Sequence, residues 1–206
     1  MSQKNKVPIV FKNLGLQNYQ STLLEMQSFT KNRHTHTKDE VWFLEHEPVY
    51  TFGSRTKKDD IPSLTNIPVI KTDRGGQLTF HGPGQLMVYL LFDLKRRSIK
   101  MRNFISSFEK AILDTIQNYK EDAFYKKNEP GIFIKEKKIV SFGLKISKGC
   151  SYHGASINIS MDMNPWNNII ICGNSSNKVS DLNNLGVNLS INEVSDDIKK
   201  NILKNF

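Results

Sequence analysis

The sequence RGGQLTFHGPGQLMVYLLFD, residues 74–93, places a glycine-rich segment directly before a continuous apolar run. The run from Leu86 to Asp93 predicts a β-strand that is covered on both faces. Glycine has no Cβ, so the segment before the strand suits close backbone approach to a ligand, although a tight connection would use the same residues. The segment matches neither GxxxxGK[ST] nor a strand-to-helix GxGxxG, so the sequence does not support a nucleotide cradle.

Three segments outside this stretch have apolar residues at helical spacing. They run from Leu16 to about Phe29, from Ile105 to Tyr119, and from Val194 to Ile202. Ser190 and Glu193 have the spacing of a capping box, which indicates that the third helix begins there. We expect the second helix to pack across a sheet, because its apolar residues form one face.

Short β-rich segments bounded by glycine or proline predict the other strands. They are residues 41–44, 49–52, 68–71, 132–134, 139–146 and 151–160, with a loop over residues 59–68. The polar stretch 135–138 between two of these strands indicates a hairpin. Helices outside a mostly antiparallel or mixed sheet predict an α+β fold, with a mixed β-sheet and packed helices.

The length and composition indicate one globular domain spanning residues 1–206. Apolar residues make up 38% and aromatic residues 10%, which is too many for an intrinsically disordered chain. The longest apolar run is far too short for a membrane span or a signal sequence, so we expect no membrane association. The chain has only 2 cysteines, which indicates no disulfide framework and favours a cytoplasmic location.

A formal net charge of +9 is compatible with a nucleic acid partner, an acidic protein partner or a lysine-rich background. The basic clusters are short and scattered, and they lack the regular aromatic interleaving of proteins that bind single strands. We therefore expect no nucleic acid partner. An acidic protein partner or a solvated basic surface explains the charge better.

The two cysteines, Cys150 and Cys172, are the candidate nucleophiles. A thiol attacks as thiolate, and only about 3% of a thiol with the reference pKa is ionised at pH 7. A cation such as Lys138 nearby would raise that fraction. Composition does not choose between the cysteines, the five histidines match no protease signature, and two distant cysteines make a poor zinc site, so no metal is expected.

Four blocks follow one another in an order and spacing that resemble a known family. They are RGGQLTFHGPGQ (74–85), KKIVSFGLK (137–145), YHGASINISMDMNP (152–165) and ICG (171–173). Together with the flanking LGLQNYQ and DEVWFLEHEPVYTFG, they resemble the lipoyl(octanoyl) transferases over roughly residues 10–175. Two departures are Ile171, where proline is usual, and Asn174, where an aromatic residue is common.

The resemblance implies the α+β fold of biotin and lipoate ligases, and it implies roles for individual residues. Cys172 is implied to be the acyl-accepting nucleophile, and Lys138 to be the lysine that activates it. The residues implied to line the acyl-substrate pocket are Arg74, Gly75, Gly76, Gln77, Leu78, Thr79, Phe80, His81, Ser141, Phe142, Gly143, Gly154, Ala155 and Ser156.

The implied reaction moves an octanoyl or lipoyl group from acyl carrier protein to a lysine of a lipoyl domain. The implied acceptors are the lipoyl domains of 2-oxoacid dehydrogenase complexes and the glycine cleavage H protein. No cofactor, ATP or metal is needed, and a monomer is expected. The alternative is an ATP-dependent lipoate- or biotin-protein ligase on the same fold, although the phosphate-facing glycine and arginine motif of biotin ligases is missing. A basic nucleic-acid-binding module is a separate alternative that charge alone suggests.

Overall fold

The computed structural model describes residues 7–57, 65–126, 129–169 and 178–206. Three helices are α1 (Tyr19–Lys31), α2 (Met101–Tyr119) and α3 (Ile191–Asn205), and short 3-10 helices span Asn164–Asn168 and Asn183–Leu185. The strands are β1 (Ile9–Gln17), β2 (Asp39–His46), β3 (Val49–Phe52), β4 (Val69–Lys71), β5 (Thr79–His81), β6 (Gln85–Leu91), β7 (Phe124–Lys126), β8 (Glu129–Ile134), β9 (Lys137–Ser147), β10 (Cys150–Asn158) and β11 (Lys178–Val179).

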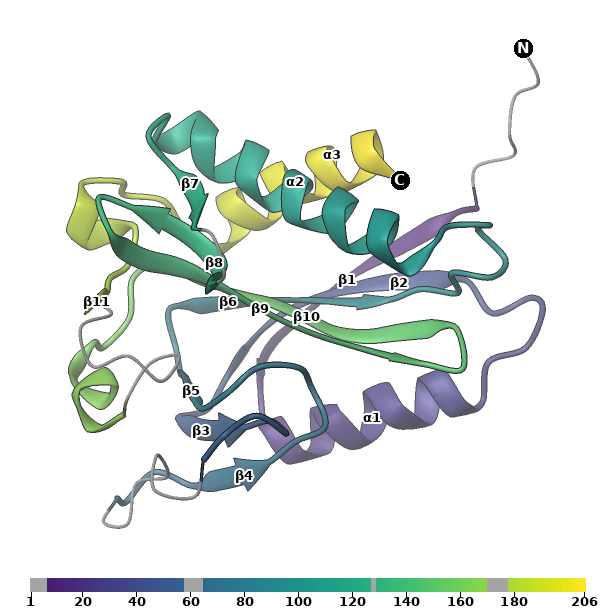
Figure 1. Ribbon diagram of the computed structural model, residues 1–206, viewed down its shortest axis with the longest axis horizontal. Helices are drawn as coiled ribbons and strands as arrows, with labels where there is room; N and C mark the ends of the chain where they lie inside the picture. The colour runs from purple at the N-terminus through teal and green to yellow at the C-terminus, as the bar shows by residue number, and fades with distance from the viewer. Residues whose placement is uncertain (1–6, 58–64, 127–128, 170–177) are drawn as a thin grey trace.

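These strands form two sheets. The large sheet has eight strands, of which seven follow the order β1-β2-β6-β10-β9-β8-β7, while β11 pairs with β9. The small sheet has the order β4-β3-β5. Figure 1 shows α2 and α3 on one face of the large sheet, and α1 and the small sheet on the other. Parallel pairing of β1 with β2 among antiparallel strands makes the large sheet mixed, so the predicted α+β fold class is confirmed.

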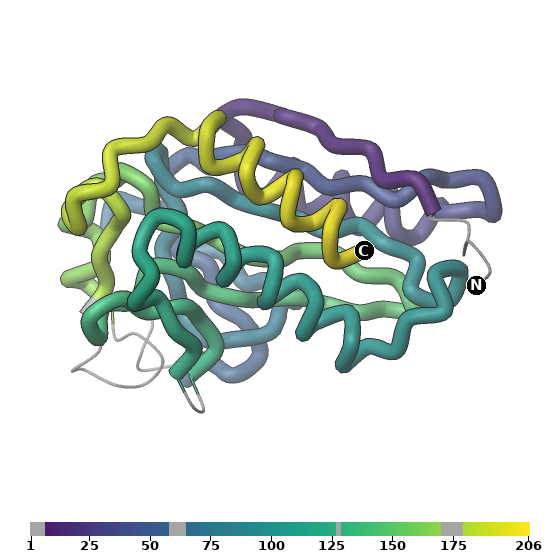
Figure 2. Tube along the Cα trace, turned by 90° about the horizontal axis from the view of Figure 1, so that it is seen from above, coloured from purple at the N-terminus to yellow at the C-terminus, as the bar shows by residue number. Residues whose placement is uncertain are grey.

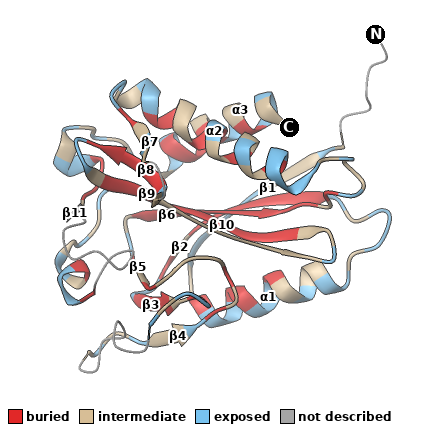
Figure 3. Ribbon diagram, in the orientation of Figure 1, coloured by how far each residue is buried: buried red, intermediate tan, exposed pale blue. Residues whose placement is uncertain are grey.

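Strand β6 lies in the interior of the large sheet, between β2 and β10, and every one of its residues is buried, as the apolar run predicted. Successive side chains of a strand point to opposite faces. Accordingly, Leu86, Val88 and Leu90 join the core that lies under α2 and α3, and the residues between them join the core under α1. Figure 3 colours β6 as buried, and Figures 1 and 2 show α2 and α3 side by side.

The first helix begins later than the sequence indicated. Asn18 caps α1, because its side chain accepts hydrogen bonds from the backbone N–H groups of Gln20 and Ser21. Leu16 lies in β1 instead, with 54% of its surface exposed, so the prediction that it belongs to the helix was wrong. Chance helical spacing between an exposed strand residue and Tyr19 produced the error.

Most other helices and strands match those predicted from the sequence. The hairpin of β8 and β9, the second helix and the strands at β2, β3, β4, β6 and β10 are confirmed. The Ser190 side chain accepts from the Glu193 backbone, and the Glu193 carboxylate accepts from the Ser190 backbone, which confirms the capping box. Four short or edge strands, β1, β5, β7 and β11, were not predicted. Among the described residues, no helix is both long and apolar enough to span a lipid bilayer.

The glycine-rich segment before β6 is not a single turn, since it contains β5. Gly84 then allows the chain to reverse into β6, with a φ of +83°. A Cβ at Gly84 would lie 1.8 Å from the backbone oxygen of Ser160, so only glycine fits where this turn passes the end of β10.

Candidate active site

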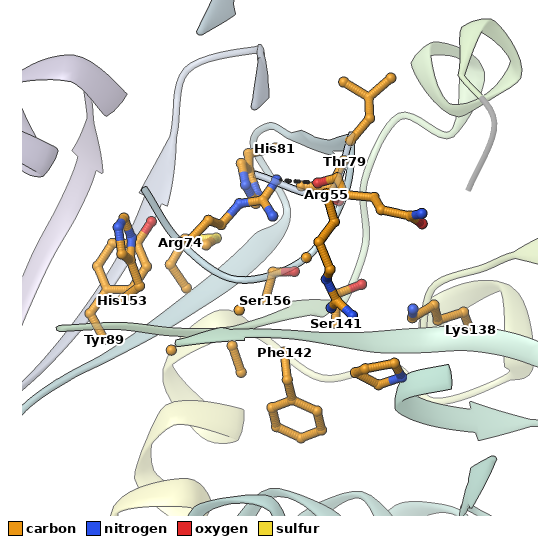
Figure 4. A pocket seen from close by; sticks show the side chains of 18 of the residues that line it. Arg55, Arg74, Thr79, His81, Tyr89, Lys138, Ser141, Phe142, His153 and Ser156 are labelled. Atoms are coloured by element: carbon orange, nitrogen blue, oxygen red, sulfur yellow. Dashed lines mark hydrogen bonds between the residues drawn. The ribbon is translucent and has the colours of Figure 1, made fainter. Parts of the chain in front are cut away.

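A pocket of about 200 Å³ lies between β9 and β10 of the large sheet and the segment 74–81, which includes β5. All of the predicted substrate-binding residues except Gly75 and Phe80 line the pocket, and Lys138 lines it too. Figure 4 shows Lys138 at one side of the pocket and His153 with Tyr89 at the opposite side.

The floor of the pocket is the β9–β10 pair, where Gly143 lies opposite Gly154. A Cβ at Gly154 would lie 1.9 Å from the backbone oxygen of Val88, and a Cβ at Gly143 would lie 3.0 Å from that of Gly75. The two glycines therefore allow β6 and the segment 74–81 to approach the floor closely. Both glycines line the pocket, and their role in binding the substrate stays a prediction.

Strand alternation decides which predicted side chains face the pocket. Figure 4 shows the ring of Phe142 pointing away from the pocket, and it packs against Phe108 of α2 at 5.8 Å between ring centroids. In β5, Thr79 and His81 line the pocket, but Phe80 is buried with Tyr50 and Trp166 on the other side. The prediction that Phe80 lines the pocket is thus corrected.

The side chain of Arg74 holds the wall of the pocket in place. Its Nη2 donates to the backbone oxygens of Thr51 at 2.7 Å and Gln77 at 2.8 Å, and its Nη1 donates to that of Gly75 at 2.9 Å. The backbone N–H of Gly75 in turn donates to the oxygen of Leu144 at 3.1 Å. Gly75 therefore anchors the wall to β9, and this anchoring explains why it lies behind the lining surface.

His153 lines the pocket in a strained conformation. Its φ of +59° is unusual for a residue other than glycine, and strain of this kind gathers at functional sites. The Nε2 of His153 donates to Asp73 at 2.9 Å, and the Tyr152 hydroxyl also donates to this carboxylate. The hydrogen bond from His153 is the main cause that lowers the pKa of Asp73 to about 2. The ionised carboxylate therefore fixes the start of the pocket wall against β10.

Two further histidines, His81 and His46, are buried and neutral. The Nδ1 of His81 donates to the side-chain oxygen of Gln85 at 2.7 Å, and its Nε2 pairs with the Thr51 hydroxyl at 3.1 Å. Burial is the largest cause that lowers the pKa of His81 well below its ordinary value, and burial also lowers the pKa of His46 to about 4. Both nitrogens of His81 have partners, which supports a positioning role over that of a general base.

Lys138 lies in β9 with only 3% of its surface exposed. A β-bulge between β8 and β9 separates the pair Ile132–Val140 from the pair Phe133–Lys138, and bulges commonly redirect side chains beside active sites. The Lys138 ammonium lies 5.6 Å from the centre of the Phe133 ring. A Cβ at Gly131 would lie 2.5 Å from Cε of Lys138, so this glycine leaves room for the lysine side chain.

Only one of the two cysteines lies among the residues that the structure describes. Cys172 lies outside the described residues. Cys150 is the first residue of β10, is half-buried and does not line the pocket. Burial raises the pKa of its thiol, which disfavours the thiolate needed for attack. These observations favour a structural role for Cys150.

Several lining residues were not predicted as binding residues. Met87 and Tyr89 come from the face of β6 that looks toward α1, Tyr19 comes from α1, and Arg55 follows β3. Arg55 lies outside the sequence blocks, and Tyr19 lies in the flanking segment LGLQNYQ. Met87 and Tyr89 lie inside an apolar run, where composition gives no sign of a binding role. The polar hydroxyl of Tyr89 within that run was the one available signal.

Comparisons with known proteins agree with this site. Residues 18–203 match the lipoyl protein ligase A/B catalytic domain family. An octanoyltransferase from Dechloromonas aromatica is 40% identical over 96% of this chain and 97% of its own length. The chain belongs to the octanoyltransferase family. Octanoyltransferases are acyltransferases, so the predicted enzyme class is confirmed.

Solved structures confirm that this octanoyltransferase family member has the ligase-like fold. A bipartite lipoate protein ligase from Thermoplasma acidophilum matches with a TM-score of 0.76 at 15% identity, covering 96% of this chain and 82% of that one. A biotin protein ligase from Aquifex aeolicus matches with a TM-score of 0.59 at 14% identity, covering 96% of this chain and 69% of that one. At these identities the likeness concerns the fold alone.

Proposed function

We propose that this chain transfers an octanoyl group from acyl carrier protein to a lysine of a lipoyl domain, through a thioester on Cys172. The observation that carries the proposal is the pocket that brings buried Lys138 together with three separate sequence blocks. Membership of the octanoyltransferase family supports the identity of the acyl group. The whole chain is proposed to act as one catalytic domain.

In the first half-reaction, the Cys172 thiolate attacks the carbonyl carbon of the carrier thioester. The new carbon–sulfur bond to Cys172 forms as the bond to the carrier sulfur breaks. Lys138, as an ammonium, favours the thiolate and then protonates the departing carrier thiolate. This exchange of one thioester for another needs no external energy source.

In the second half-reaction, the amine of the acceptor lysine attacks the thioester on Cys172. Lys138, now neutral, accepts a proton from the amine, the carbon–nitrogen bond of the amide forms, and Cys172 leaves as the thiolate. An amide is more stable than a thioester, so this step proceeds without ATP. The side chains of the pocket floor and wall hold the acyl chain during both steps.

The proposed partners are octanoyl-acyl carrier protein as donor, and as acceptors the lipoyl domains of 2-oxoacid dehydrogenase complexes and the glycine cleavage H protein. Carrier proteins are typically acidic, so the net charge of +9 would steer the encounter with the donor. We propose that a monomer works in the cytoplasm, because a reducing compartment keeps a nucleophilic thiol in its active form.

We expect the reaction to proceed without ATP, because the donor thioester already supplies the driving force. Purified protein, octanoyl-carrier protein and a lipoyl domain should yield the octanoylated domain in the presence of a metal chelator, as followed by intact-protein mass spectrometry. Free octanoate with ATP and Mg²⁺ should give no product. Octanoyl-adenylate formation under those conditions would instead assign the protein to the ligases.

We expect Gly76→Val to raise the KM for the acyl donor about tenfold, because Gly76 lines the pocket with a φ of +97° and its Cβ position lies 3.1 Å from Nη1 of Arg74. A β-branched side chain there would move the wall that Arg74 holds. Initial rates across donor concentrations measure the effect.

Gly186→Val is the matched control for backbone strain. Gly186 has a φ of +79°, and apart from its chain neighbours no atom of the described residues lies within 4 Å of its Cβ position. Both variants should lose comparable stability in thermal unfolding, since both force valine into a left-handed conformation. If the KM for the donor changed equally in the two variants, Gly76 would be needed only for the backbone conformation of the turn and not for the pocket wall.

A further inference from the structure

Glu129, the first residue of β8, lines the same pocket as Lys138 but has no place in the mechanism above. It is the only carboxylate among the described residues that line the pocket. Three cationic side chains, Arg55, Arg74 and Lys138, line it as well. Glu129 therefore places one negative charge in a pocket whose other charged lining residues are cations.

Among the residues that the structure describes, the carboxylate of Glu129 makes one long ion pair, with Lys126. Its Oε1 lies 3.6 Å from Nζ of Lys126, and its Oε2 is buried without a hydrogen-bond partner among the described residues. Lys126 already donates to Glu136 at 3.0 Å, so its ammonium has a better partner. A buried carboxylate oxygen without a partner is costly in a folded protein and calls for an explanation.

The second half-reaction requires a cation to enter this pocket. A lysine side chain is an ammonium at neutral pH, and it must approach Lys138 before it loses its proton. Like charges at short range oppose that approach, particularly in a partly desolvated site. A carboxylate beside the path would offset the repulsion, and the broad χ3 torsion of glutamate lets its oxygens turn at little cost.

We infer that Glu129 binds the ε-ammonium of the acceptor lysine and holds it beside Lys138. The ammonium releases its first proton to solvent, and Lys138 accepts the second proton as the resulting amine attacks the thioester. This inference rests on the proposed function, because it assigns a recognition role within the second half-reaction. Glu129 is a positioning residue for the acceptor amine. It should have no part in the acylation of Cys172, where no substrate ammonium is involved.

The test compares Glu129→Gln with Glu136→Gln in the two half-reactions. Both changes remove a carboxylate near Lys126, but Glu136 has 71% of its side chain exposed and does not line the pocket. Glu129→Gln should form octanoyl-enzyme at the wild-type rate, which also shows that the variant is folded. Its kcat/KM for the lipoyl domain should fall about tenfold to a hundredfold, mainly through KM, while Glu136→Gln should match wild type.

An uncharged nucleophile, used in place of the acceptor lysine, distinguishes loss of ammonium binding from general damage to the site. Hydroxylamine is uncharged near neutral pH, so Glu129→Gln and wild-type octanoyl-enzyme should react with it equally fast. An unchanged kcat/KM for the lipoyl domain, or an equal loss with hydroxylamine, would overturn the inference. Absence of octanoyl-enzyme in the wild-type protein is a different result, because it would reject the proposed function itself and the inference with it.

Discussion

Cys172→Ala should lose acyl transfer by at least about 10³-fold, whereas Cys150→Ala should retain near-wild-type activity. The reason is chemical, since no other group can carry the thioester if Cys172 is the nucleophile. Cys150 lies outside the pocket, and burial raises the pKa of its thiol, so it is poorly suited to replace Cys172.

Mass spectrometry of peptides from protein incubated with octanoyl-carrier protein measures the site of acylation directly. Octanoylation should occur at Cys172 alone. Cys150→Ala is the matched control, because it removes a thiol of equal size elsewhere in the chain. Continued transfer by Cys172→Ala together with an inactive Cys150→Ala would reverse the assignment and reject the proposed mechanism.

Lys138→Arg should reduce turnover about 10²- to 10⁴-fold, because guanidinium keeps its proton at working pH and cannot accept one from the acceptor amine. The cation is retained in this variant, so iodoacetamide should still label Cys172 readily. Lys138→Ala should lose both turnover and rapid labelling. Acyl transfer and alkylation rates, measured together across pH, separate the electrostatic role from proton transfer.

The space around Lys138 requires a control for the larger side chain of arginine, because Gly131 and Phe133 pack closely on it. Lys137→Arg supplies that control, since Lys137 is the neighbouring residue of β9 and does not line the pocket. It should be fully active. Near-normal turnover in Lys138→Arg would show that Lys138 acts only through its charge.

The sequence predicted the parts of this fold whose pattern is local. The apolar run of β6, the capping box at Ser190 and the helical face of α2 each depend on neighbouring residues, and each is confirmed. The edge strand β1 was missed because its exposed residues show no clear alternation. Leu16, the last apolar residue of that strand, was wrongly joined to the helix that follows.

For the site as well, the sequence predicted the features that are local in the chain and missed those that depend on folding. The blocks around Arg74, Gly143 and Gly154 were predicted together, and the structure places them around one pocket. Phe80 was included only because it lies between Thr79 and His81, and strand alternation turns it away. Glu129 was not considered, because its significance depends on burial and on neighbouring charges, which the linear sequence does not contain.

The strand order of the large sheet has a consequence for the synthesis of this protein. The partners of β6 are β2, made before it, and β10, which is separated from it by α2 and three further strands. Until β10 emerges from the ribosome, β6 can pair with β2 along one edge, but its other edge has no partner from this sheet. Unpaired apolar edges of this kind promote aggregation. The nascent chain is therefore most vulnerable while α2 to β9 are being made, and the pocket forms only when β10 closes that edge.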